Sequence, residues 1–501
     1  MTRILRLLQA RINRRTTRLG VVSMVSLLSA CAGYQPVPPQ VKPIDSIALE
    51  THAPSAQDTD TWPQDGWWSA YGDDQLDQLM QRALKNNPTL AAAQARIARA
   101  QAAANLARST ESLQVGTGVD ASYGRQSENY LLPRPPLGKG GEYISQGQAV
   151  VNFGYELDLW GRNDALIRAA QAQLKAAAFD HDAARLALTT SIARAYAQLA
   201  SQYDLQDILL ATLEQRRAIR KLIDERVANG LDTRVEVKQA ETNEAALRID
   251  LEQLATTIKV TRLQITALAG DMPAAADAIK RPTMTAVPFN IPVNLPIDLL
   301  ARRPELAAQR ARITAALGEA EAAKAQFYPS INLNAFIGFQ SIGLGQLFSG
   351  GSLINSVGSA FRLPIFDGGR LRANYAGKAS DIDAAVAQYN QSVLAAAQEV
   401  AEQLTRIADL SREEAAAREA LSAADEAHRL ATLRYKGGLS PYLTVLTVET
   451  QLLAQRRALA NVKARRDDLQ VSLIRALGGG FSETGTAPQL SAGPQAGNRH
   501  Q

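Results

Sequence analysis

Hydrophobic and polar positions change period abruptly within residues 353–372, LINSVGSAFRLPIFDGGRLR. Up to Ile365, apolar and aromatic residues dominate one parity, a period of two that is typical of a β-strand with one apolar face. Asp367-Gly368-Gly369 then supplies a capping carboxylate and flexible backbone, and from Arg370 the apolar period becomes three and four. This stretch therefore predicts a strand that leads directly into a helix.

The same transition occurs earlier in the chain. Alternation from Val151 to Leu159 is followed by Trp160-Gly161-Arg162 and a long helical pattern, and the two junctions are 370 − 162 = 208 residues apart. Another alternating segment precedes each of these strands. The pattern thus predicts four strands, at about 113–124, 144–160, 331–340 and 353–366.

Each junction leads into a long helical hairpin. No proline interrupts residues 162–227, which as one helix would be about 100 Å long, a length that indicates a coiled-coil assembly. Asn229-Gly230 ends this helix because both residues tolerate the left-handed conformation, and a return helix runs to Leu268. The second hairpin repeats the plan, with Gly437-Gly438 at its tip and a return helix over 439–477.

The two halves of the chain match each other. The tips are 438 − 230 = 208 residues apart, and Arg303-Pro304 echoes Asn87-Pro88 at an offset of 304 − 88 = 216, so we expect two structural repeats. The predicted division is a lipoprotein signal peptide (1–30), a lipidated tether (31–65), a first repeat (66–270), a linker at the helical waist (271–296), a second repeat (297–480) and a flexible C-terminal tail (481–501).

The N-terminus is typical of a bacterial lipoprotein. Arginines are followed by an apolar stretch, Leu19 to Leu28, and then by Ser29-Ala30-Cys31. We expect cleavage before Cys31 and lipid, palmitate included, on its sulfur and new amino terminus. Ala32 as the second mature residue resembles lipoproteins that are sorted to the outer membrane. An ordinary signal peptide with an unrelated cysteine is the alternative. Cys31 is the only cysteine, so an intrachain disulfide is excluded.

The strand count predicts an oligomer. Outside the signal segment, no uncharged apolar run reaches the roughly 20 residues of a transmembrane helix, so a membrane-spanning form would need a closed barrel of strands. Four strands cannot close a barrel, and an open edge is not tolerated in lipid. We therefore predict an α+β membrane protein whose strands pair with those of other copies, with lipid on the apolar face and water on the polar face. A soluble β-sandwich is the alternative.

Charge and chemistry narrow the function further. The net charge is only +5, from 54 basic and 49 acidic residues, and several arginines lie in the signal segment, so nucleic-acid binding is not favoured. His52, His181, His428 and His500 are scattered, with no metal-ligand spacing and no nucleophile–base pair. The glycine-rich segments lack the Lys-Ser/Thr ending of a phosphate loop. We predict no enzyme activity, no metal and no cofactor.

These features together carry a resemblance to a family. They are Trp67-Trp68, the Asn-Pro and Arg-Pro helix openings, the junctions Leu159-Trp160-Gly161-Arg162 and Phe366-Asp367-Gly368-Gly369-Arg370, and the two Gly-Leu hairpin tips. Nearly the whole mature chain resembles the TolC/OprM-type outer-membrane efflux proteins, and within them the lipid-anchored NodT-like branch. The resemblance implies a homotrimer, with twelve strands in one outer-membrane barrel and the helices in a long periplasmic coiled-coil tunnel. It also implies a periplasmic adaptor (membrane fusion) protein and an inner-membrane pump, commonly of the resistance-nodulation-division (RND) type.

The resemblance also assigns candidate sites. The hairpin tips that would contact the adaptor are Asn229, Gly230, Leu231, Asp232, Gly437, Gly438, Leu439 and Ser440. The alternative is that the glycines serve only as helix stops. In well-known members, aspartates on the second hairpin ring the closed periplasmic aperture. Thr444 and Thr447 occupy those positions here, which weakens the case for an acidic, cation-binding gate, although Asp232 and Glu236 could place carboxylates nearby.

Three functions are compatible with this interpretation. The first is a passive exit duct for drugs or other small toxic compounds in a tripartite efflux system, opened by an iris-like shift of the hairpins. The second keeps the duct but assigns it to type I protein secretion. The third is a lipid-anchored coiled-coil scaffold without a pore.

Overall fold

The computed structural model describes residues 40–44, 63–129, 141–285 and 302–483. The predicted signal peptide, Cys31, most of the tether, residues 286–296 of the linker and most of the tail lie outside the described residues. The chain divides into two compact units. The strand unit comprises Met1–Lys42, Gln101–Gln173 and Arg312–Ala387, and the hairpin unit comprises Pro43–Ala100, Leu174–Ala311 and Gln388–Gln501. Within the described residues, no helix has the length and apolar character to cross a membrane.

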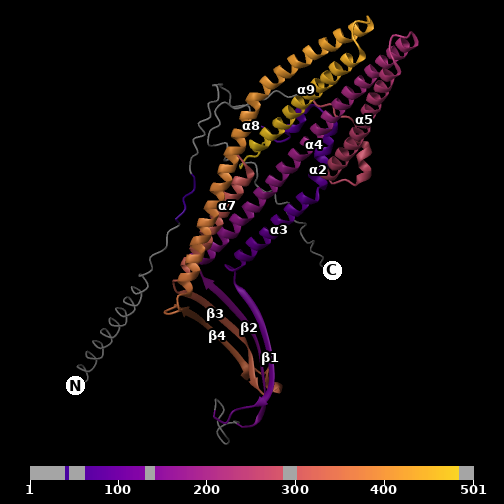
Figure 1. Ribbon diagram of the computed structural model, residues 1–501. Coiled ribbons are helices and arrows are strands. Elements are labelled where there is room, and N and C mark those ends of the chain that lie inside the picture. The colour runs from indigo at the N-terminus through magenta and orange to yellow at the C-terminus, as the bar shows by residue number, and fades with distance from the viewer. Residues whose placement is uncertain (1–39, 45–62, 130–140, 286–301, 484–501) are drawn as a thin grey trace, which may run out of the picture. The chain divides into compact units, whose positions relative to one another are not determined.

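The strand unit contains one antiparallel sheet in the order β1-β2-β3-β4, and Figure 1 shows the four strands side by side. The strands are β1 (Gln114–Arg125), β2 (Tyr143–Leu157), β3 (Ser330–Ile342) and β4 (Leu353–Arg362). The prediction of four strands is confirmed, but two of them end early, β2 at 157 instead of 160 and β4 at 362 instead of 366. After β2 the chain turns at once, with Gly161 at a φ of 69°. After β4, Pro364 has no N–H to give to a sheet ladder.

The register places apolar side chains on one face of the sheet. Thr117, Val151, Ile337 and Asn355 are paired in sequence across the four strands, so residues of their parity share a face. The large exposed side chains of that face are Val115, Val119, Tyr123, Tyr143, Val151, Tyr155, Leu333, Ile337, Leu353, Val357 and Phe361. The opposite face carries mainly Asn, Gln, Ser and Gly. Among the described strands, β1 pairs only with β2 and β4 only with β3, so both are edges.

The junctions after β2 and β4 start two helices of equal length. The helices are α4 (Arg162–Ala228) and α8 (Arg370–Lys436), each of 67 residues. Asp367 caps α8 as predicted, because its carboxylate accepts hydrogen bonds from the N–H groups of Gly369 at 3.0 Å and Leu371 at 2.9 Å. Before α4, the carboxylate of Asp158 accepts from the N–H of Asp164 at 2.9 Å.

The return helices, which lie in the hairpin unit, also match. They are α5 (Arg234–Leu268) and α9 (Tyr442–Ala476), each of 35 residues. A glycine with positive φ lies two residues after the end of each helix, Gly270 at 78° and Gly478 at 85°. A Cβ on Gly270 would lie 2.9 Å from the carbonyl oxygen of Asn86, and a Cβ on Gly478 would overlap that of Arg302. The offsets of these contacts, 478 − 270 = 208 and 302 − 86 = 216, are those found in the sequence.

The shorter elements of the chain are the 3₁₀ helices η2 (Trp67–Tyr71), η3 (Pro273–Ala278), η4 (Leu344–Gln346) and η5 (Gly350–Ser352), and the helices α2 (Asp74–Asn86), α3 (Pro88–Ser109) and α7 (Pro304–Ala325).

The core of the hairpin unit lies where its N-terminal elements pack on α4 and α5. Tyr196 is fully buried, and its hydroxyl donates to the carboxylate of Asp73 at 2.9 Å. The same carboxylate caps α2 and accepts from the N–H of Thr283 at 2.7 Å, which joins three segments.

Candidate functional site: the hairpin tips and the sheet faces

Both hairpin tips have the same backbone geometry. Gly230 and Gly438 have φ values of 74° and 73°. In each tip the leucine after the glycine donates its N–H to the carbonyl five residues earlier, at 2.9 and 2.8 Å, and the glycine N–H bonds to the carbonyl three residues earlier. These are the two bonds of a Schellman motif, which ends a helix with a left-handed residue. The predicted turns are therefore built from a conformation that glycine favours.

The tips present apolar side chains. Leu231 and Leu439 are 64% and 73% exposed, and Val235 and Leu443, four residues later in each tip, are each 60% exposed. No atom lies within 4 Å of a Cβ built on Gly230 or Gly438. The geometry is suited to docking of another apolar surface at each tip.

Asp232 is held by contacts within the hairpin unit. The Nε of Arg226 lies 2.8 Å from its Oδ2, and the hydroxyl of Tyr435 on α8 donates to the same oxygen. The Arg226 guanidinium also lies over the Tyr435 ring, 4.7 Å from its centroid. Burial favours a higher pKa for Asp232, but the hydrogen bonds from Arg226 and Tyr435 outweigh it and hold the pKa below its usual value. Asp232 thus links the first tip to the second hairpin.

A second charged link lies among the hairpin helices. Glu449 on α9 is 2% exposed, and its Oε1 lies 2.8 Å from the Nε of Arg216 on α4. Arg216 also donates to the carbonyl of Asn243 on α5 at 2.5 Å. One guanidinium therefore joins α4, α5 and α9, and loss of either charged partner would leave a buried ion without compensation.

The predicted aperture positions lie on the exposed side of α9. Thr444 and Thr447 are both exposed, and the hydroxyl of Thr447 bonds to the carbonyl of Leu443 at 2.9 Å. Glu236 accepts from the N–H and the hydroxyl of Thr233, in a capping box that starts α5. The carboxylates of Asp232 and Glu236 are thus both engaged in local contacts.

Sequence reasoning missed the charged partners inside the hairpins. Tyr442, Val445, Glu449 and Leu452 are all buried on α9, at spacings of three, four and three. A glutamate within a buried apolar stripe requires a partner from another helix, because an isolated carboxylate is costly to bury. That signal was present in the sequence, although it does not identify Arg216 as the partner.

Aromatic pairs lie towards both ends of the sheet. Near the helical junction, Trp160 stacks on Tyr328 with centroids 4.9 Å apart and donates its indole N–H to the carbonyl of Pro329 at 2.7 Å. Towards the other end, Tyr123 stacks on Tyr143 with centroids 5.7 Å apart. Bands of aromatic residues at two levels are typical of strands that cross a lipid bilayer.

The polar face of the sheet is hollowed near the loop end. Asp120, Gln148 and Gln340 are aligned across three strands, and they line a hollow of about 920 Å³ with other Gln and Ser side chains. Amide and hydroxyl groups suit contact with water.

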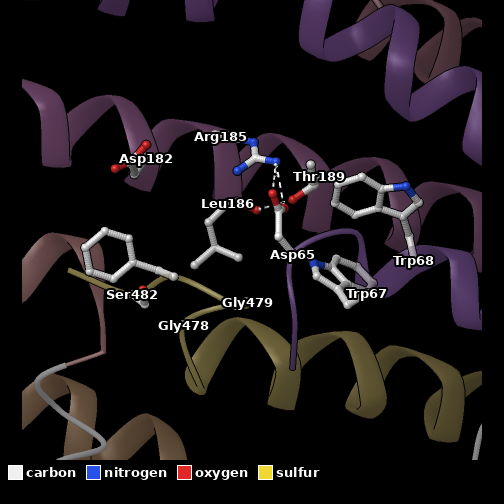
Figure 2. Close-up of a pocket in the computed structure, with 12 residues that line it drawn as sticks. Asp65, Trp67, Trp68, Asp182, Arg185, Leu186, Thr189, Gly478, Gly479 and Ser482 are labelled. Carbon is white, nitrogen blue, oxygen red and sulfur yellow. Dashed lines mark hydrogen bonds and ion pairs between the residues drawn. The ribbon is translucent and has the colours of Figure 1, made fainter. Parts of the chain in front are cut away.

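A pocket of about 250 Å³ in the hairpin unit has a structural explanation. Figure 2 shows Asp65 facing Arg185, whose guanidinium donates to both carboxylate oxygens at 2.6 and 2.9 Å. Gly478 and Gly479 line the same pocket, and a side chain on Gly479 would overlap Leu186. The pocket thus lies where the end of α9 packs closely on α4. Among the described residues, no group of His, Cys, Asp or Glu is arranged to hold a metal ion.

The two long hairpins and the open sheet with one apolar face define the class of TolC-like outer-membrane channels. A family model described as outer membrane efflux protein matches residues 79–271 and 295–479, and the chain belongs to this family. The recognition made from the sequence is confirmed.

Individual relatives agree with this assignment. The chain is 32% identical over 486 residues to the multidrug resistance outer membrane protein MdtP of Shigella flexneri, which covers 94% of this chain and 98% of that protein. It is 34% identical over 378 residues to the fusaric acid resistance protein FusA of Burkholderia cepacia, covering 73% and 70%. The crystal structure of the outer membrane protein VceC of Vibrio cholerae matches with a TM-score of 0.79 and 37% identity, over 84% of this chain and all of that one.

Proposed function

We propose that the chain is one protomer of a passive outer-membrane exit duct in a tripartite efflux system. The observation that carries this proposal is the sheet. Its apolar face is exposed, with Val357 on β4 88% exposed, and β1 and β4 each have a partner on one side only in the described strands. Apolar residues on a free sheet face and two open edges are costly in water and are relieved by lipid and by another strand.

Three copies supply twelve strands. In the proposed homotrimer, β1 of one protomer pairs with β4 of the next, which closes a barrel in the outer membrane with lipid outside and water inside. The hairpins of the two proposed repeats, residues 66–270 and 297–480 joined by the linker 271–296, then continue the bore as a helical tunnel in the periplasm. The equal lengths of α4 and α8, and of α5 and α9, support this repeat.

The remaining parts have proposed roles in the same assembly. Cys31 carries lipid in the outer membrane, as in the NodT-like branch. The two tips contact a periplasmic adaptor through residues 229–232 and 437–440, and an RND-type inner-membrane pump supplies the energy. The names of MdtP and FusA, multidrug and fusaric acid resistance, favour small toxic compounds over secreted proteins as cargo.

Single-channel recording tests the proposal directly. Purified full-length protein, reconstituted in planar bilayers, is expected to run as a heat-resistant trimer on SDS gels and to conduct ions, alone or with its adaptor. A trimer that never conducts, with or without the adaptor, would favour the pore-free scaffold and overturn the proposal.

A further inference from the structure

A short N-terminal segment contacts one long helix through its backbone. The N–H groups of Gln40 and Val41 donate to Oδ1 of Asp383 on α8, at 2.8 and 2.9 Å. The N–H of Ile44 donates to Oδ1 of Asn390 on the same helix, at 2.9 Å. Side chains of α8 therefore accept hydrogen bonds from the backbone N–H groups of this segment.

The contacts have the same spacing along α8 as along the N-terminal segment. Asp383 and Asn390 are seven residues apart, so they lie on one side of α8 about 10 Å apart along its axis. From Val41 to Ile44 the chain advances three residues, or about 10 Å when extended. Pro43 favours this extended form, because the residue before a proline avoids the helical region. Bonds from two N–H groups to one carboxylate are also stronger than neutral ones.

We propose that Asp383 and Asn390 form a docking site for the chain's own N-terminal segment, residues 40–44, and that this site sets how far the lipid can lie from the helices. The second part rests on the proposed function, in which Cys31 carries lipid and α8 starts at the membrane surface. From Cys31 to Gln40 the chain has 40 − 31 = 9 residue steps, which reach no further than about 32 Å.

The reach of the tether agrees with the position of the site. Asp383 is 383 − 370 = 13 residues from the start of α8, or about 20 Å along the helix. The nine steps are therefore long enough to bring the lipid to the start of α8, with only about 12 Å to spare. The docking site holds the lipid beside the same protomer's helical junction, in the leaflet through which the strands enter the membrane.

Amide hydrogen exchange of the full-length protein in detergent, read by mass spectrometry, tests the docking site. The peptide that contains residues 40–44 should be protected in the wild type, and D383A/N390A should speed its exchange by about tenfold or more. The matched control is Q391A, which changes an exposed neighbour on the same helix and should exchange like the wild type. D383N keeps an acceptor oxygen and should lie between the two.

Two further measurements separate this proposal from the proposed function. The heat-resistant trimer and its conductance should be retained in D383A/N390A, which shows that the variant is folded. C31S, without lipid, should keep the protection of residues 40–44. Equal exchange in D383A/N390A and the wild type, or no protection in the wild type, would overturn the docking site even if the channel conducts. Protection with no conductance would keep the site and reject the duct.

Discussion

At the scale of single residues, Asp73 shows how one buried carboxylate joins distant parts of the hairpin unit. It caps α2 and accepts hydrogen bonds from Thr283 and Tyr196. Burial favours a higher pKa for Asp73, but the hydrogen bonds from Thr283, Tyr196 and Leu76 outweigh it, so the pKa lies below its ordinary value. A depressed carboxyl pKa stabilises the fold above the unfolded-state pKa of about 4, and this stabilisation is lost as the pH falls through the lower folded-state value.

D73A is expected to lower the free energy of unfolding by about 2–4 kcal/mol at pH 7, because it removes a helix cap and leaves buried donors without an acceptor. The difference from the wild type should shrink below pH 4. Circular dichroism melts at pH 7 and pH 3 measure both effects. D74A, at the exposed acid next to it in the first turn of α2, is the control and should change stability by less than about 1 kcal/mol. A loss that is the same at both pH values would contradict the linkage.

The Asp232–Tyr435 contact gives a second prediction at this scale. Y435F removes the hydroxyl that donates to Asp232, and with it a link between the two hairpins. A loss of about 1–2 kcal/mol from the packing in which this bond forms would change the ratio of the two gating states about 5- to 30-fold. Single-channel recordings should show a changed open probability. E236Q keeps the capping box at the same tip and should behave like the wild type; equal gating of Y435F and the wild type would remove Tyr435 from the contacts that set the gating equilibrium.

At the scale of elements, local chemistry predicted where the strands and helices begin. Tertiary packing decided where two strands end and which side chains link the hairpins. The period of two located all four strands, and Asp367 was predicted as a cap because a cap needs only its neighbours in sequence. The ends of β2 and β4 were placed too late, because alternation continues through Leu159 and Ile365 although the sheet ladder does not. The link from Asp232 to Tyr435 spans 203 residues and depends on how the hairpins pack, so no local pattern contains it.

The second tip gives a prediction for an element. A valine at Gly438 would have to adopt a φ of 73°, at a cost of about 1–2 kcal/mol, or the turn would rearrange. We expect G438V to impair efflux, measured as drug susceptibility in cells with the adaptor and pump, while the trimer still assembles. G437A is the matched control, because a Cβ there comes no closer than 3.5 Å to another atom. Unchanged susceptibility of G438V would remove the case for docking at this tip.

At the scale of the whole molecule, each unit leaves surfaces that a single copy does not satisfy. The strand unit exposes an apolar sheet face and two strand edges, and the hairpin unit exposes apolar residues at both tips. These features lie in one chain whose long helices α4 and α8 belong to both units. The proposed association with further copies, with lipid and with a partner at the tips would satisfy all of these surfaces at once.

The sheet faces give the most direct test of this conclusion. Val357 lies in the middle of β4 on the apolar face, and Ser356 lies beside it on the polar face. If the apolar face is in lipid, V357R should cost about 2–4 kcal/mol per protomer and should lower the yield of heat-resistant trimer in the outer-membrane fraction. In the same proposed arrangement S356R would face water in the bore, and it should assemble, with altered conductance. Equal assembly of both variants would show that the apolar face does not lie in lipid. The reason is that a bilayer disfavours an arginine on the face that it contacts and tolerates one on the opposite face of the same strand.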